Sequence, residues 1–499
     1  MKKLIFAFLV GILLVAFLAS CTGPQNPTSG PTAIPPTVHK ESPTSTLTLT
    51  PSPPTATATP ITTVLNAENL SAGDPYIPEL GNQGYEVENY NLHLILDPQK
   101  VWIDGDVTIA AKSTMADLRQ VSFDFVGFEI KSIIVDGQSA TSFRDGKKLI
   151  VNLPTVLSSG ADFSVSIAYQ GEPVMEQSPY VPFVPHLGMF FQQDTIFVVS
   201  EPDGARYWFP CNDHPRDKAT YHFELVVPDT LTGVANGKLT SVRQGIPGIF
   251  PDGKAADMYV WDMSYPMATY LATVAVGNYE RVESTTTKGI QLRSYVFPEK
   301  KSAYESMLPT ISEAMDWMSD TFGAYPFDEF GYVMVKGLDG ASLETQTMVI
   351  IDQNIRSQNI YVHEMSHQWF GDWVSLNSWQ DTWRNEGIAT YIAALWPNRD
   401  NQQSFENKIN PQLIPIPVSN YPIGTPPPSF MFGSDVYNKG ALFLQAIRNK
   451  VGDEAFFQGL HAYLAQYGGS VASRDDFRKM MEQTGGTSLE DLFATWLDH

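Results

Sequence analysis

Cysteine is nearly absent from this chain of 499 residues, which contains only Cys21 and Cys211. Two cysteines allow at most one intramolecular disulfide, which excludes the disulfide-rich frameworks of small exported domains. The chain must therefore be held together by its hydrophobic core and by any metal it binds. A buried and inert thiol is the expected state of Cys211.

Basic residues are scarce as well. The chain has 32 Lys and Arg against 54 Asp and Glu, a formal net charge of −22 at pH 7. This excess repels the phosphates of nucleic acids and anionic lipid headgroups, so we expect no nucleic-acid partner. An acidic surface is compatible with cationic ligands such as free amines, although solubility alone also accounts for it.

Long hydrophobic runs are missing except at residues 4–19, which follow Lys2 and Lys3. This run is too short for a comfortable membrane span and is typical of a secretory signal peptide over residues 1–20. Its end, Leu18-Ala-Ser-Cys21, resembles a bacterial lipobox, in which Cys21 is lipidated after cleavage in front of it. We expect an exported protein that faces outside the cytoplasm and is lipid-anchored to the cell membrane or outer membrane. The alternative is an uncleaved signal anchor with an incidental cysteine.

Residues 21–72 contain the lipidated cysteine and a segment dominated by proline and threonine, with few apolar side chains. Such a composition cannot bury enough surface to offset the entropy of ordering the chain. We interpret it as a disordered stalk that holds the rest of the protein away from the membrane.

The remaining sequence predicts two domains of different type. Residues 73–285 show short alternating runs rich in β-branched and aromatic residues, separated by turn signals such as Asp136-Gly137, which predicts an all-β N-terminal domain. From residue 286 to 499 the hydrophobic period moves toward 3.6, with strands expected at 332–335 and 347–351 and helices toward the C-terminus. The second domain is therefore α+β and mostly helical. Ser488 and Asp491 predict a capping box for the last helix.

The run His363-Glu-Met-Ser-His367 carries the clearest chemical signal. On a helix, positions i and i+4 face the same way, so His363 and His367 can bind one Zn²⁺ while Glu364 points toward a water that it can deprotonate. The spacing by itself leaves two alternatives open: a helix with two surface histidines, or a degenerate site that has lost its metal.

Glu386 is the candidate third ligand. It lies 19 positions after His367, in an apolar-patterned segment (residues 381–396) that can form a second helix packed on the first. Two histidines and one glutamate, with an open fourth position, are the ligand set of thermolysin-type zinc hydrolases. Two ordinary helices with incidental charges remain the alternative.

The segments His363-Glu-Met-Ser-His-Gln-Trp-Phe-Gly-Asp372 and Trp383-Arg-Asn-Glu-Gly-Ile-Ala389 closely resemble the aminopeptidase N family of gluzincin metallopeptidases. Further similar segments are Glu201-Pro-Asp-Gly-Ala-Arg206, Phe209-Pro-Cys-Asn-Asp213, Met267-Ala-Thr-Tyr-Leu271 and Val436-Tyr-Asn-Lys-Gly-Ala441. The resemblance covers roughly residues 75–499. It implies an all-β N-terminal domain followed by a thermolysin-like catalytic domain.

The resemblance also implies roles for individual residues. It assigns one Zn²⁺ to His363, His367 and Glu386, the role of general base to Glu364, and stabilisation of the tetrahedral intermediate to Tyr437. Glu201 and Glu344 match the positions that bind the free α-ammonium of a substrate, since a desolvated ammonium needs a paired carboxylate.

The substrate-binding segment, which contains Ala341, Ser342, Leu343 and Glu344, departs from the family's usual Gly-x-Met-Glu-Asn. Leu343 replaces Met and Thr345 replaces Asn, which puts the exact exopeptidase preference in doubt. The strand that follows would offer its edge to the substrate backbone. The last catalytic-domain helix pattern ends near His499, so we expect a short form without the further C-terminal domains of familiar members.

The leading hypothesis is a zinc aminopeptidase that removes N-terminal residues from peptides with a free N-terminus, as part of peptide catabolism. A zinc endopeptidase or another hydrolase using the same site is the alternative within enzymes. An inactive peptide-binding lipoprotein is the alternative outside them.

Overall fold

The structure, a computed structural model, describes residues 70–498 apart from 193, 402–404, 406–408 and 410–420. All of these residues belong to one compact unit, Pro60–His499. The predicted signal peptide, Cys21 and the stalk up to residue 69 lie outside the described residues. Among the described residues, no helix is long and apolar enough to cross a membrane.

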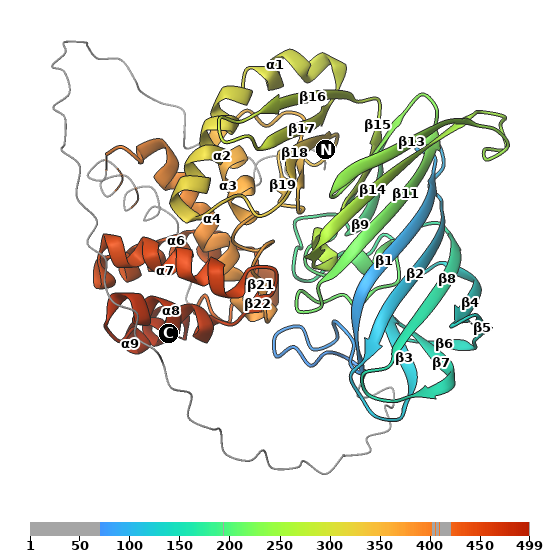
Figure 1. Ribbon diagram of the computed structural model, residues 1–499, viewed down its shortest axis with the longest axis horizontal. Coiled ribbons are helices and arrows are strands. Elements are labelled where there is room, and N and C mark those ends of the chain that lie inside the picture. The colour runs from blue at the N-terminus through green and yellow to red at the C-terminus, as the bar shows by residue number, and fades with distance from the viewer. Residues whose placement is uncertain (1–69, 193, 402–404, 406–408, 410–420, 499) are drawn as a thin grey trace, which may run out of the picture. The chain divides into compact units, whose positions relative to one another are not determined.

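The first half of the described chain forms three β-sheets (Figure 1). The largest has eight strands in the order β13 (Lys238–Ile246), β14 (Ala256–Met267), β11 (Ala219–Pro228), β1 (Tyr85–Leu96), β2 (Ile103–Ser113), β8 (Asp162–Gly171), β4 (Glu129–Val135) and β5 (Gln138–Ser139). Alternate residues of β1 and β2 are buried, as the alternating sequence pattern predicts. The prediction of a β-rich N-terminal domain is confirmed.

Two smaller sheets complete this domain. One contains β3 (Leu118–Asp124), β7 (Lys148–Leu157) and β6 (Ser142–Asp145), and the other contains β12 (Thr232–Ala235), β15 (Val274–Gly277), β10 (Thr195–Val199) and β9 (Gly188–Gln192). The turn predicted at Asp136-Gly137 joins β4 to β5, and both residues have positive φ, 48° and 78°. That conformation is the one a two-residue hairpin loop requires.

The second domain contains a five-stranded sheet in the order β16 (Glu280–Thr285), β17 (Gln291–Val296), β18 (Glu329–Val335), β20 (Met348–Asp352) and β19 (Ser342–Leu343). β18 and β20 are the two strands predicted at 332–335 and 347–351. The boundary expected at residue 285 falls at the end of β16, which pairs with β17 of this sheet. By its hydrogen bonds, β16 therefore joins the second domain.

Helices make up most of the remaining chain. The described residues include α1 (Lys301–Glu305), α2 (Leu308–Phe322), α3 (Gln358–His367), α4 (Thr382–Leu395), α6 (Ser434–Val451), α7 (Asp453–Tyr467), α8 (Arg474–Gly485) and α9 (Glu490–Leu497). The buried face of α2 carries Ile311, Met315 and Met318, which confirms the helical period read from the sequence. The short strands β21 (Ser375–Leu376) and β22 (Val471–Ala472) pair in parallel.

The capping box predicted at Ser488 is wrong. The residue before α9 is Leu489, which has no side-chain cap, and its N–H donates to Glu482 Oε1 of α8 at 2.7 Å. A capping box forms instead at Ser473 and Asp476, at the start of α8. The Ser488 hydroxyl accepts from the Glu490 N–H at 3.3 Å, so the bonds between Ser488 and Asp491 that a capping box requires do not form among the described residues.

Hydrogen bonds from the first domain reach the second domain beside α3. Lys218 Nζ donates to the backbone oxygens of Asp372 (2.7 Å) and Trp373 (3.1 Å). The buried Asp74 carboxylate accepts from the Trp379 N–H (3.2 Å) and lies 3.0 Å from His214 Nε2. Because buried polar groups need partners, these bonds link the two domains at residues 372–379, which follow α3.

Candidate metal centre and active site

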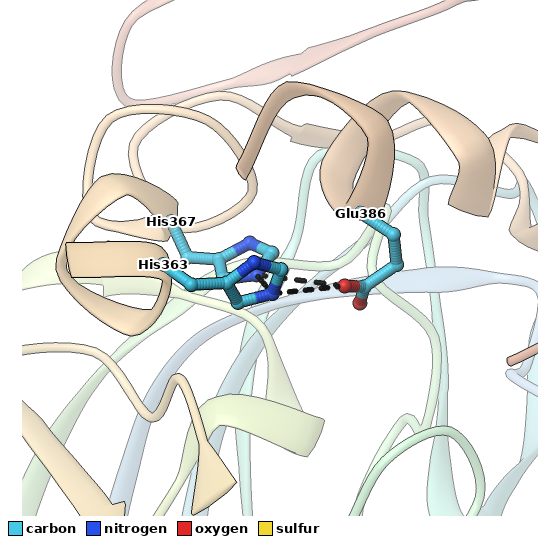
Figure 2. A group of neighbouring side chains, drawn as sticks. All are labelled: His363, His367 and Glu386. Atoms are coloured by element: carbon cyan, nitrogen blue, oxygen red, sulfur yellow. Dashed lines mark hydrogen bonds and ion pairs between the residues drawn. The ribbon is translucent and has the colours of Figure 1, made fainter. Parts of the chain in front are cut away.

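His363 and His367 project from the same face of α3, as the i, i+4 spacing predicts (Figure 2). Their Nε2 atoms lie 3.2 Å apart. His367 is fully buried, and burial lowers the pKa of its imidazole to about 4. The neutral imidazole is the form that binds a metal, so the helix presents this histidine ready for coordination.

Glu386 reaches the two histidines from α4. Its Oε2 lies 3.3 Å from His363 Nε2 and 3.7 Å from His367 Nε2, and one donor atom from each residue lies within 4.8 Å of the others (Figure 2). A buried carboxylate facing two imidazole nitrogens is stabilised by a cation placed between them. Nitrogen and oxygen donors converging from two helices fit a Zn²⁺ ion.

Glu364 lies between the two histidines in sequence and faces β19. Its Oε1 accepts a hydrogen bond from the Ser342 hydroxyl at 2.7 Å. Burial raises the pKa of the Glu364 carboxyl to about 8. A carboxyl group held beside a metal site with a raised pKa is suited to exchanging a proton with a substrate or a water.

Tyr437 is on α6, and its ring is stacked with that of His363 at a centroid distance of 6.0 Å and an interplanar angle of 14°. Burial, followed by the nearby carboxylates of Glu386, Glu201 and Glu344, raises the pKa of its phenol well above the usual range. The hydroxyl therefore stays protonated at neutral pH and can act as a hydrogen-bond donor.

Glu201 and Glu344 bring two further carboxylates to the centre. Glu201 follows β10 of the first domain, and Glu344 follows β19 of the second. Oxygens of Glu201, Glu344 and Glu386 all lie within 4.8 Å of one another, and Glu344 Oε1 is buried without a hydrogen-bond partner among the described residues. Burial raises the pKa of both carboxyls, that of Glu344 to about 6 and that of Glu201 well above its usual range. Such a group of carboxylates is suited to a cationic ligand.

The site therefore brings together eight residues that the sequence singled out: Glu201, Ser342, Glu344, His363, Glu364, His367, Glu386 and Tyr437. Leu343 is buried on the opposite face of its strand, whereas Ala341 is exposed. Only the tertiary structure brings Glu201 close to Glu344, because the two residues lie in different domains.

Sequence reasoning missed two residues that hold the segment after β19, which contains Glu344. The side chain of Gln368 accepts from the Thr347 N–H (2.8 Å) and donates to the Glu344 carbonyl (3.2 Å). Asn236, from the first domain, donates to the carbonyls of Gln346 (2.7 Å) and Leu271 (2.9 Å). Gln368 directly follows His367, which could have drawn attention to it. Asn236-Gly237 resembles an ordinary turn, so its sequence offers no signal of this role.

Two imidazoles from one helix and a carboxylate from the next, beside a glutamate base, define a zinc metallohydrolase site of the gluzincin kind. The family model for the Peptidase M1 N-terminal domain matches residues 86–271. The family model for the Peptidase family M1 domain matches residues 307–496. The chain belongs to peptidase family M1. The solved structures that match this chain are M1 zinc metallopeptidases, so the cofactor of this site is one catalytic Zn²⁺.

Curated relatives are similar over part of their length. Aminopeptidase M1-B of Oryza sativa subsp. japonica is 26% identical over 322 residues, covering 59% of this chain and 36% of that protein. Probable aminopeptidase 1 of Sulfurisphaera tokodaii is 25% identical over 437 residues, covering 82% of this chain and 52% of that protein. The chain thus spans between about a third and about a half of the length of these relatives.

Solved structures match over nearly their full length. The M1 zinc metallopeptidase from Deinococcus radiodurans is 28% identical, with a TM-score of 0.75, and the match covers 86% of this chain and 96% of that one. A mutant of that protein bound to a Tyr-Ser-Ala substrate has a TM-score of 0.74 and 28% identity, covering 86% and 97%. A structure of the same kind is described as having two domains.

Proposed function

We propose that this protein is a zinc aminopeptidase that hydrolyses the first peptide bond of peptides with a free N-terminus. The observation that carries the proposal is the convergence of Glu201, Glu344 and Glu386 beside the two histidines. A metal site alone accounts for peptide hydrolysis. Two additional buried carboxylates account for selection of a substrate that begins with an ammonium group.

His363, His367 and Glu386 are the residues that would hold the zinc ion. When bound, Zn²⁺ supplies Lewis-acid polarisation of the scissile carbonyl and lowers the pKa of water. The Nδ1–H of His367 donates to the Phe370 carbonyl (3.3 Å), which orients its ring so that Nε2 faces the site.

Glu364 is the general base in this mechanism. Its carboxylate takes a proton from the attacking water and then delivers that proton to the nitrogen of the leaving peptide, so one residue serves both half-reactions. The Tyr437 hydroxyl donates a hydrogen bond to the oxygen on which negative charge develops. Tyr437 lies on α6, whereas Glu364 lies on α3, so the two roles fall to different helices.

Glu201 and Glu344 bind the substrate's α-ammonium and thereby set the distance from the N-terminus to the reacting carbonyl. Ala341, Ser342 and Leu343 form the edge of the five-stranded sheet, because β19 pairs on one side with β20. The free edge of such a strand can pair with an extended peptide. Binding the amine and the backbone together aligns the first peptide bond with Glu364.

We further propose that the protein is exported, anchored outside the cytoplasm through a lipid on Cys21, and degrades peptides for nutrition. The support is the order of sequence features: a signal-like apolar run, Cys21 at its end and a proline- and threonine-rich stalk. Metabolic labelling of intact cells with a radioactive fatty acid checks this: wild type should be labelled, and Cys21→Ser should not.

Paired peptides that differ only in a free or acetylated N-terminus test the activity, using the protein without residues 1–63. We expect zinc-dependent cleavage of the free-amine peptide alone. Glu364→Gln should abolish cleavage, whereas Glu305→Gln, which alters an exposed acid on α1, should not. Equal cleavage of both peptides would identify an endopeptidase, and zinc binding without any cleavage would identify a peptide-binding protein.

A further inference from the structure

The hydroxyl of Ser342 contacts the carboxylate of Glu364, the proposed general base. Its Oγ donates to Glu364 Oε1 at 2.7 Å. This is the one hydrogen bond formed by the Glu364 side chain among the described residues of the protein. It joins the sheet edge, where the substrate backbone is expected, to the helix that carries the metal ligands.

The backbone holds Ser342 in this position. β19 pairs antiparallel with β20, with Ser342 opposite Ile351, and the N–H of Asp352 donates to the Ala341 carbonyl at 3.1 Å. Side chains alternate along a strand, so Leu343 enters the core while Ser342 and Glu344 point toward the site. The hydroxyl is therefore placed by the sheet before any substrate arrives.

We propose that Ser342 is a positioning residue for the general base, an inference that rests on the proposed function. Its hydroxyl occupies Oε1 of Glu364 and fixes the plane of the carboxylate, which leaves Oε2 as the oxygen that takes up and returns the proton. The Ser342 proton stays on its own oxygen throughout, so no group transfer is involved. A hydrogen bond to an ionised carboxylate is the strong kind and restricts rotation of a side chain that otherwise has free torsions.

This role is distinct from substrate binding. A serine that only contacts the substrate would affect KM, whereas a serine that orients the base affects kcat. In the family pattern Gly-x-Met-Glu-Asn, the position before the methionine is not specified. The role therefore depends on the particular residue that this chain carries there.

Ser342→Ala, Ser342→Thr and Glu364→Asp form the test, with a panel of aminoacyl p-nitroanilides as probes and zinc content measured for every variant. We expect Ser342→Ala to lower kcat about tenfold, the loss typical of one charge-assisted hydrogen bond, with KM changed less than twofold. Ser342→Thr keeps the hydroxyl and should restore kcat to within about threefold. In the Glu364→Asp background, where the shorter carboxylate no longer reaches the hydroxyl, Ser342→Ala should change kcat less than twofold.

Four outcomes would overturn the proposal: an unchanged kcat in Ser342→Ala, a change confined to KM, the same loss in the Glu364→Asp background, or no rescue by threonine in a folded variant. A crystal structure of zinc-loaded Ser342→Ala gives a readout that does not depend on activity. The Glu364 carboxylate should be rotated or present in two orientations, and an unchanged carboxylate contradicts the inference. A wild type that cleaves no probe counts against the proposed function, while this structural comparison still decides the role of Ser342.

Discussion

Gly387 and Gly440 bring helices α4 and α6 into backbone contact: a Cβ placed on Gly440 would lie 2.8 Å from the Cα of Gly387. Gly387 directly follows the candidate zinc ligand Glu386, and Gly440 lies three residues after Tyr437. Glycine is required at both positions because any side chain would push the helices apart. This contact therefore sets the separation between the helix that carries Glu386 and the helix that carries Tyr437.

Gly440→Ala is expected to separate α4 from α6 and to move Tyr437 away from the metal site. Overpacking should cost about 1–3 kcal/mol of stability, even though alanine favours helix formation by up to about 1 kcal/mol. Peptidase assays should show a lower kcat with one zinc per chain retained. Lys450→Ala, an exposed change on the same helix, is the control and should leave both properties unchanged. A fully active Gly440→Ala enzyme would show that the helix separation does not control Tyr437.

Loss of a residue that only supports a metal ligand typically lowers metal affinity by roughly 10–100-fold. Glu386→Gln changes a ligand itself and should lower the zinc affinity by more than that. The amide keeps the shape but removes the negative charge that the cation needs. Zinc titration against a competing chelator measures the affinity, with Glu305→Gln as the control. Because zinc binds only the folded state, chelation should also lower the stability of the wild type by about 2.7 kcal/mol where zinc had been present at about 100 times its Kd. Unchanged zinc affinity in Glu386→Gln would remove this residue from the ligand set.

Asn236→Ala should affect both stability and substrate binding. The Asn236 side chain donates to the carbonyls of Gln346 and Leu271 and accepts from the Thr273 N–H at 2.6 Å, so its removal leaves buried backbone groups without partners. A loss of at least about 2 kcal/mol is expected. The segment that carries Glu344 should loosen, which raises KM for free-amine peptides more than it alters kcat.

The matched control for Asn236→Ala is Asn354→Ala, because Asn354 is exposed. Thermal or urea unfolding measures the stability difference, and steady-state kinetics measures KM. If Asn236→Ala destabilised the protein while leaving KM unchanged, Asn236 would hold the two domains together without influencing substrate binding.

Asp213 predicts a pH dependence of stability. Burial, together with the nearby Asp124 carboxylate, raises the pKa of the Asp213 carboxyl to about 7 from its usual 3.8. Between about pH 4 and 7 the folded state keeps a proton that the unfolded state has lost. Stability should therefore fall as pH rises through this range, by at most about 1.4 kcal/mol per pH unit from this group.

Urea unfolding at several pH values between 4 and 8 checks this prediction with Asp213→Asn, which cannot ionise. The slope of stability against pH should decrease in that variant. Asp162→Asn, which alters an exposed carboxylate, should leave the slope as in the wild type. A slope unaffected by Asp213→Asn would show that this carboxyl titrates alike in the folded and unfolded states.

Local patterns predicted much of this protein. The alternating runs of the first domain form strands, and the Asp136-Gly137 pair forms the hairpin turn, because residue type and backbone conformation are coupled over a few residues. The i, i+4 spacing places His363 and His367 on one face of α3 for the same reason. The apolar pattern of residues 381–396 indicated Glu386, and the resemblance to known metallopeptidases alone indicated Tyr437; the structure places both beside those histidines.

Other features could not be derived from neighbouring residues. The Leu489 N–H at the start of the last helix pairs with Glu482 of the preceding helix, and Ser488 accepts from the Glu490 N–H instead of forming the predicted capping box with Asp491. Strand β16 pairs with the second domain although the sequence around it continues the pattern of the first. In both cases a hydrogen-bond partner from elsewhere in the fold determines the outcome, and local propensity carries no information about that partner.

The sequence by itself determined which residues can bind a metal and which helix face presents them, because side-chain chemistry and the 3.6-residue period are properties of the local chain. Only the tertiary structure decided that Glu201 of the first domain lies with Glu344 of the second, that Ser342 contacts Glu364, and that Asn236 supports the substrate-binding segment. These contacts join residues from separate elements. Their geometry depends on how sheets and helices pack, which is a collective property of the whole core.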